Sequence, residues 1–252
     1  MLVGVLSRGA ITYAGHATVL IEMGEARLLT DPLLRERLLH LRRHGPVPRA
    51  PAVDAVLLSH LHLDHVDVRS LEAVDRRARV VLPRGGASVV AGRGFAGVEE
   101  VAVGDTVRVG EVSVHVVPAR HLGKRTPLPG SARAEAVGYL VEGERRTWFA
   151  GDTDLFDAMP ALAPVDLALV PIWGWGPRLG SGHLSPRSAA EALARVRPRV
   201  AVAIHHGTYS PLLPRGRPSY LDTPLSRFRQ EAARRAPDTD VRPLRPGEAT
   251  EV

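Results

Sequence analysis

Six residues, His60-Leu61-His62-Leu63-Asp64-His65, constrain this chain more than any other stretch of it. They follow directly on the apolar run Asp54–Ser59, which predicts a short buried strand. His60 and His62 are two residues apart, so an extended segment points both imidazoles to the same side. Asp64 and His65 follow where the chain turns, and they offer a carboxylate and a third imidazole to a neighbouring point. Neutral imidazole and carboxylate suit zinc, manganese or iron, so the motif predicts a metal site at the end of a strand.

The composition narrows the side chains that such a site can use. The chain has 252 residues and no cysteine. Cysteine nucleophiles, all-cysteine zinc sites and iron–sulfur clusters are therefore excluded. Any metal ion must be held by His, Asp or Glu.

Strands and helices alternate through both halves of the sequence, with no linker and no short repeat. This order predicts an α/β fold in a single domain that covers residues 1–252. The expected strands are 17–22, 26–30, 54–59, 80–82, 106–109, 112–117, 136–142, 147–150, 167–171 and 200–204. The expected helices are a short amphipathic one within 33–44, and others over 69–77, 185–196 and 224–235, the last two capped by Ser185 and Thr223.

Three further candidate ligands stand at the ends of other predicted strands. His121 follows the strand 112–117, Asp152 closes the turn after 147–150, and His205 ends the strand 200–204. Each residue alone has an ordinary explanation as a cap or as a strand-end side chain. Their occurrence together, in order after the hexapeptide, favours a role as metal ligands.

These motifs resemble those of the metallo-β-lactamase superfamily. Within it, the similarity is to the branch that contains N-acyl-phosphatidylethanolamine phospholipase D and, more distantly, ascorbate-6-phosphate lactonase. It runs from about residue 11 to about residue 210, over the matching stretches Gly15–Val19, Leu29–Pro32, Asp54–His65, His121–Thr126, Phe149–Thr153 and Ala203–His205. The resemblance implies a four-layer αββα sandwich with two metal ions at the edges of its sheets.

The resemblance also implies a ligand set. One ion is expected on His60, His62 and His121, the other on Asp64, His65 and His205, with Asp152 bridging both. A carboxylate can bridge because it has two oxygens for two ions. The family pattern Ala-Ile-His-x-Gly-Thr selects His205 and leaves His206 in the variable place. His16 and Asp31 fall in matching stretches and are expected to orient the ligands from behind.

The implied activity is that of a metal-dependent hydrolase. A hydroxide bridging two divalent ions, with zinc favoured and manganese or iron as alternatives, would attack a phosphodiester or a lactone- or ester-like bond. Two ions bring four positive charges against two ligand carboxylates, which favours a small anionic substrate. Asp64 and His183 are the candidate catalytic groups. His183 precedes a helix that starts at a proline, where it could protonate the leaving oxygen, bind the phosphoryl group or lie on a surface loop. β-Lactam hydrolysis is not expected, because the true β-lactamases lack a bridging aspartate and are exported.

Five further side chains are candidates for contact with the substrate. Trp173 and Trp175 flank a glycine after a predicted strand, where they could form a pocket wall or pack in the ordinary way. Lys124, Arg125 and Arg178 are the cations expected to face an anion, with a solvated loop as the alternative for each.

The charge balance raises the question of nucleic acid. The chain has 33 basic and 27 acidic residues, a net charge of +6 and a pI near 10.6. However, the arginines are scattered, and the 53 residues from Asp152 to His205 leave no room for an inserted RNA-clamping domain. No nucleic-acid partner is expected, and a nuclease is the alternative enzyme. A non-catalytic metal-binding scaffold is a second alternative, which the seven filled ligand positions disfavour.

The apolar runs of the sequence also bear on location and substrate. None approaches the ~18 residues of a membrane span, and Met1–Leu6 lacks the basic start and the cleavage site of a signal peptide. We therefore expect a cytoplasmic protein with no integral membrane segment; a homo-oligomer is compatible with the sequence. The resembled phospholipase has a long N-terminal extension that is missing here, and its loop differs beyond Thr126, so a phospholipid substrate is not expected.

Overall fold

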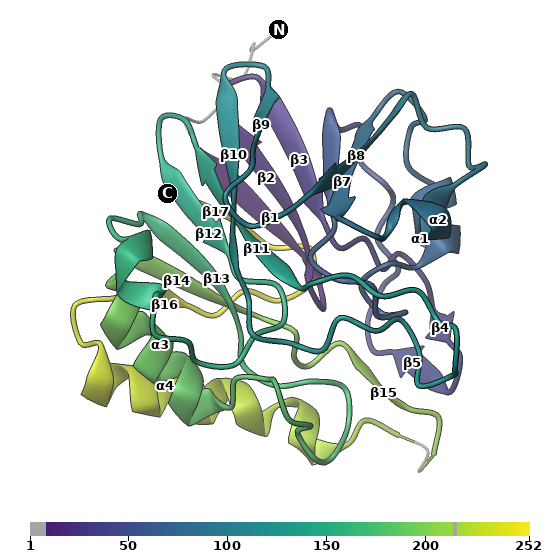
Figure 1. Cartoon of the computed structure of the whole chain (residues 1–252). Helices are drawn as coiled ribbons and strands as arrows, with labels where there is room; N and C mark the ends of the chain where they lie inside the picture. The colour runs from purple at the N-terminus through teal and green to yellow at the C-terminus, as the bar shows by residue number, and fades with distance from the viewer. Residues whose placement is uncertain (1–8, 214–215) are drawn as a thin grey trace, which may run out of the picture.

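The computed structural model describes residues 9–213 and 216–252, and two seven-stranded sheets dominate it (Figure 1). The first sheet has the order β17-β1-β2-β3-β6-β7-β8. Its strands are β1 (Ala10–Gly15), β2 (Thr18–Met23), β3 (Ala26–Thr30), β6 (Ala55–Leu57), β7 (Arg79–Pro83), β8 (Gly97–Val101) and β17 (Ala249–Glu251). From β3 to β8 the neighbouring strands are parallel.

The second sheet has the order β16-β14-β13-β12-β11-β10-β9. Its strands are β9 (Thr106–Val109), β10 (Val112–Pro118), β11 (Val137–Glu142), β12 (Arg146–Phe149), β13 (Leu167–Pro171), β14 (Val200–Ile204) and β16 (Asp240–Arg242). Both β13 and β14 are buried along their whole length, which is typical of parallel strands covered on both faces.

The helices cover the outer faces of the two sheets. Against the second sheet lie α3 (Pro186–Val196), α4 (Thr223–Arg235) and the short turn η1 (Met159–Leu162); the turn η2 (Ser219–Leu221) contacts α4. The helices α1 (Val68–Glu72) and α2 (Ala87–Val90) belong to the first sheet. Three apolar clusters fill the spaces between layers: one between the sheets, one under α3 and α4, and one beside α1. This arrangement confirms the predicted four-layer αββα sandwich.

The helix predicted within 33–44 is wrong. Those residues instead form β4 (Arg37–Leu38) and β5 (Leu41–Arg43), which pair with β15 (Tyr209–Pro211) in a small third sheet. Leu38 pairs with Leu41, and both pack against Tyr209. The apolar spacing that suggested a helix thus serves a hairpin, because pairing with a distant strand outweighs local propensity.

The ends of the predicted helices also differ in part. α1 ends at Glu72 rather than at residue 77, because the Asp75 side chain accepts from the Arg77 amide and stabilises a turn there instead (2.9 Å). Ser185 caps α3 as predicted, in a capping box with Ser188. Thr223 does not cap α4; the cap position is Asp222, and the Thr223 hydroxyl donates to the Ser219 carbonyl (3.1 Å).

The strand directions bring distant parts of the sequence to one end of the sandwich. In the first sheet, β1, β3 and β6 run the same way, since β1 and β3 are both antiparallel to β2 and β3 is parallel to β6. In the second, β10, β12 and β14 share one direction by the same reasoning. The segments that follow these six strands contain every predicted metal ligand.

Candidate metal centre

The loop after β6 carries four of the predicted ligands. It turns where the Val66 amide donates to the His62 carbonyl (2.8 Å). His60 and His65 are fully buried, whereas His62 is half-buried. The motif therefore wraps around one point and presents its side chains on two sides of it.

Three imidazoles form what we call the first trio: His60, His62 and His121. The Nδ1 atom of His62 lies 3.0 Å from Nε2 of His60 and 3.1 Å from Nε2 of His121. His121 comes from the segment after β10, so this trio joins the two sheets. These three nitrogen atoms can all reach a single ion.

Asp64, His65 and His205 form the second trio. The Nε2 atoms of His65 and His205 are 3.1 Å apart, and Oδ2 of Asp64 lies 3.8 Å and 3.6 Å from them. His16, at the end of β1, lies 3.1 Å from the same Asp64 oxygen through its Nε2 atom. Its carbonyl accepts from the His205 amide (2.7 Å), which links the second trio to the first sheet.

Asp152 lies between the two trios. Its Oδ2 atom is 3.2 Å from Nε2 of His65, 3.3 Å from that of His205 and 3.9 Å from that of His60. Its other oxygen, Oδ1, is buried and has no hydrogen-bond partner among the described residues. Gly151 allows this approach, because it has a φ of +59° and a Cβ there would lie 2.5 Å from Cβ of Ser59. The unpaired oxygen indicates a ligand that the carboxylate is placed to bind.

The outward nitrogens of four imidazoles are fixed by acceptors. Ser59 Oγ donates to Asp31 (2.6 Å) and so is free to accept from His60. Three more pairs follow the same pattern: His65 Nδ1 with Asp31 Oδ2 at 2.7 Å, His121 Nδ1 with the Gly182 carbonyl at 2.6 Å, and His205 Nδ1 with the Trp173 carbonyl at 3.1 Å. Since Nδ1 of each ring donates, the Nε2 atom of each neutral ring presents a lone pair to the centre. Lone pairs that converge in this way are stabilised by a cation between them.

Burial and charge keep most of these groups in the form that binds metal. Burial lowers the pKa of His121 to about 4. Burial also holds the pKa of His60 well below its usual value, with a further contribution from the charge of His65. For Asp152, burial acts to raise the pKa, but the charges of His205 and His65 outweigh it and hold the pKa well below the usual range. Most of the cluster is therefore deprotonated near neutral pH.

His65 is the exception, and it indicates where positive charge is favoured. Burial acts to lower its pKa, but the charges of Asp152, Asp31 and Asp64 hold that pKa well above its usual value. Three carboxylates around one point favour a cation there, either a proton or a metal ion.

Backbone strain gathers at the same place. His16, Asp31 and His205 have φ values of 56°, 31° and 57°, in the left-handed region that normally favours glycine. Such a conformation costs about 1–3 kcal/mol each, and persists where the surroundings hold it. Each of these residues directly follows a strand, and the turn redirects its side chain into the cluster.

The structure brings His183 to the cluster, at the start of α3. Its Nε2 atom lies 3.4 Å from Oδ2 of Asp152, and its ring centroid is 4.6 Å from that of His121. The two tryptophans make different contacts. Trp173 contributes its carbonyl to His205, and its indole nitrogen donates to the Gly176 carbonyl (2.9 Å). Trp175 packs beside the cluster of β4, β5 and β15.

The three predicted substrate cations have different surroundings. Arg125 spans the ligand loop, because its guanidinium donates to the carbonyls of Leu61 and Val66 (3.0 Å each). Its donors are therefore used to hold the loop. Lys124 donates to the Pro127 carbonyl (3.3 Å) and lines a cavity of about 390 Å³ that also reaches His62. Arg178 is exposed on the loop before α3.

His206 is placed outside the cluster. It is buried, and its ring is nearly parallel to that of Tyr13, at 6.4 Å between centroids. The structure thus directs His205 into the second trio and its neighbour away from it.

Sequence reasoning missed two contributors to the site. Ser59 links Asp31 to His60, and its only signal was a polar residue at the end of an apolar run. The Gly182 carbonyl, which accepts from His121, is a backbone group and gave no signal at all.

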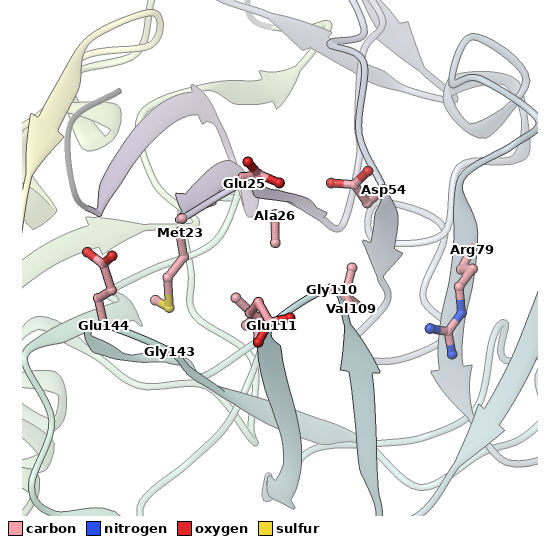
Figure 2. A pocket seen from close by; sticks show the side chains of 12 residues that line it. Met23, Glu25, Ala26, Asp54, Arg79, Val109, Gly110, Glu111, Gly143 and Glu144 are labelled. Carbon is pink, nitrogen blue, oxygen red and sulfur yellow. The ribbon is translucent and has the colours of Figure 1, made fainter. Parts of the chain in front are cut away.

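A separate cavity of about 880 Å³ opens at the opposite end of the sandwich (Figure 2). It lies among the turns that join β2 to β3, β9 to β10 and β11 to β12. Its charged lining is mostly acidic, from Glu25, Asp54, Glu111 and Glu144, with Arg79 at one side. None of the predicted metal ligands lines it.

An αββα sandwich with histidines and aspartates clustered at one end of its sheets defines a class of metal-dependent hydrolases. The chain belongs to the β-lactamase superfamily, whose domain matches residues 26–206. Among the described residues, no helix is both long and apolar enough to cross a membrane.

Similar proteins come from several organisms. A metal-dependent hydrolase of Methanopyrus kandleri is 30% identical over an alignment of 256 positions, gaps included, that covers 96% of this chain and 99% of that protein. N-acyl-phosphatidylethanolamine-hydrolyzing phospholipase D 1 of Caenorhabditis elegans is also 30% identical, over 87% of this chain and 68% of its own length. Igni18, a metallo hydrolase of Ignicoccus hospitalis, has the same fold, with a TM-score of 0.69 at 20% identity over 96% of this chain and 97% of that one.

Proposed function

We propose that the protein uses two divalent metal ions to hydrolyse a phosphodiester bond, or a lactone- or ester-like bond, in a small anionic substrate. The observation that carries the proposal is the convergence of two ligand trios on Asp152, whose Oδ1 atom is buried without a partner.

The donor set fits a pair of ions. The first trio would hold one ion through three neutral imidazoles, and the second trio would hold the other through two imidazoles and the Asp64 carboxylate. Asp152 would bridge them. Such a set suits zinc, and also manganese or iron. When bound, a pair of divalent ions polarises the scissile group and supplies a hydroxide near neutral pH.

His183 is placed to assist the departure of the leaving group. It is half-buried and lies beside Asp152. Burial acts to lower its pKa, but the hydrogen bond and the charge of Asp152 outweigh burial and raise that pKa. An imidazole whose pKa is raised toward neutrality can donate a proton to a leaving oxygen. We therefore assign it the role of general acid.

The cavity beside His62 supports an anionic substrate. Its described lining includes Lys124, Arg125 and Arg133 and no carboxylate. Because the Arg125 donors already hold the ligand loop, Lys124 and Arg133 are the cations available to a substrate. The identity with a phospholipase D that hydrolyses N-acyl-phosphatidylethanolamine supports the phosphodiester over the ester.

The test is a panel of substrates on protein loaded with zinc, manganese or iron in turn. The panel contains bis(p-nitrophenyl) phosphate, a lactone series and a thioester series. We expect turnover of the phosphodiester, and loss of both bound metal and turnover in the H60A/H62A variant. The matched control is His115→Ala, which replaces a histidine paired with Glu142 on the second sheet, away from the trios. Full turnover by metal-free H60A/H62A protein would contradict the proposal.

A further inference from the structure

A third cavity, of about 420 Å³, lies beside His206, next to the second trio. It is bounded by β1, by the segments that follow β14 and β16, and by the first half of α4. None of the seven predicted metal ligands lines it. A molecule bound there would therefore not contact the predicted metal ligands.

His206 forms part of the wall of this cavity. It is 7% exposed, and among the described residues neither ring nitrogen makes a hydrogen bond of normal geometry. Buried polar groups in proteins are generally paired, so an unpaired imidazole beside a cavity indicates a ligand. Both nitrogens are buried in the wall of the cavity.

The mouth of the cavity carries unneutralised positive charge. Among the described lining residues, Arg217, Arg229 and Arg245 stand beside one carboxylate, that of Asp222. Arg217 is already paired with that carboxylate (2.6 Å). Within the described chain, the guanidinium groups of Arg229 and Arg245 make neither an ion pair nor a hydrogen bond. The two arginines are exposed, so they can pair with an anion at the entrance.

Part of the cavity lining is apolar. Tyr13 and Leu221 are almost fully buried, and Leu225, Leu244 and Pro246 also belong to this part, beside the polar residues His44, Thr208 and Ser226. The lining thus combines exposed arginines, an apolar part and one unpaired imidazole. The N-terminus of α4, which is the positive end of the helix dipole, lies on the same side, because Asp222 and Leu225 line the cavity.

We propose that this cavity binds a small amphiphilic anion, an organic phosphate or carboxylate, whose apolar body enters the cavity and whose head pairs with Arg229 and Arg245. The cavity volume limits the ligand to a small molecule. The proposal is independent of the reaction at the metal centre.

Calorimetric titration of metal-loaded protein with hexyl phosphate and with hexanoate tests the proposal. We expect saturable binding of at least one of them, weakened at least tenfold in the R229Q/R245Q double variant. The matched control is Arg234→Gln, an exposed arginine of α4 that does not line the cavity. Metal content and turnover should be unchanged in both variants, since neither touches the trios.

Three results would overturn the proposal. Binding of both anions by R229Q/R245Q with wild-type affinity would place them at the metal centre instead. Equal binding of hexanol would show that charge plays no part. If neither anion bound the parent protein at millimolar concentrations, the cavity would not be a binding site for small amphiphilic anions. His206→Leu is a second variant; it should also weaken binding, with its melting temperature measured to confirm that it folds.

Discussion

The first and second trios differ in their access to solvent and in their support. In the second trio, His65 and His205 are buried and the Asp64 side chain is 14% exposed. In the first, His62 and His121 are both half-buried, and no carboxylate belongs to that trio alone. Two strained residues, Asp31 and His16, contact the second trio directly.

This difference suggests a division of labour between two chemically similar sites. A buried site with its own carboxylate and fixed neighbours should hold a divalent ion tightly. A more open site made of neutral imidazoles should exchange its ion more readily and should face the substrate cavity beside His62. Asp152 is the one predicted ligand that both trios share.

The largest expected effect comes from the shared residue. Asp152→Asn keeps the size of the side chain but removes the charge that lies between the trios. We expect turnover to fall by well over the roughly 10- to 100-fold that loss of an outer partner costs, and both ions to bind more weakly. Steady-state kinetics and metal analysis would measure this. Unchanged turnover would show that the two trios act independently.

Removal of one ligand from each trio separates the two sites. His121→Ala should release the ion of the first trio and leave that of the second. His205→Ala should do the reverse. Chelator competition on each variant should find the ion that remains in H121A harder to remove than the one in H205A. Equal resistance in both variants would contradict the division of labour.

A smaller effect is expected from Asp31→Asn, which removes the carboxylate that orients His65. We expect affinity for the ion of the second trio to fall roughly 10- to 100-fold. Metal titrations followed by calorimetry should show that the affinity falls in the binding phase that is the tighter one in the parent protein. The ion of the first trio serves as the internal reference, although Ser59 links Asp31 to His60. A fall in affinity confined to the looser binding phase would reverse the assignment of the tight site to the second trio.

The seven predicted ligands differ in how far the sequence could predict that they meet. His60, His62, Asp64 and His65 stand within six residues, so their shared side follows from local geometry. His121, Asp152 and His205 are single residues, and their meeting depends on which strands run parallel. Strand direction is set by long-range pairing, which the sequence indicated only through the family resemblance.

Other elements were missed for related reasons. The edge strands β8, β16 and β17 are short and have polar or exposed residues, so their apolar pattern is weak. β1 lies within the first thirty residues, which the sequence predicts as strands, but it was given no bounds of its own. The acceptors of His121 and His205 are carbonyl oxygens, whose positions no side chain reveals. The strain at Asp31 and His16 likewise appears only once the strands are in place.

The last prediction contrasts His205 with its neighbour. His206→Gln should leave both ions bound, because His206 lies outside the second trio. It should change how stability depends on pH. Burial is the largest cause lowering the pKa of His206 to about 4, against an unperturbed value of 6.5. The unfolded chain therefore binds the extra proton between pH 6.5 and pH 4, and the free energy of unfolding falls as the pH is lowered through that window.

One proton corresponds to about 1.4 kcal/mol per pH unit, or about 3 kcal/mol over the whole window. Urea unfolding of metal-free protein at several pH values gives the free energy of unfolding as a function of pH. Between pH 6.5 and pH 4, the slope of this plot should be shallower in His206→Gln than in the parent protein, by up to about 1.4 kcal/mol per pH unit. Metal-free protein is required because bound ions would add their own pH dependence through the trios. Identical slopes would mean that His206 is already paired in solution. Loss of a metal ion from His206→Gln would instead reopen the choice between His205 and His206 as the last metal ligand.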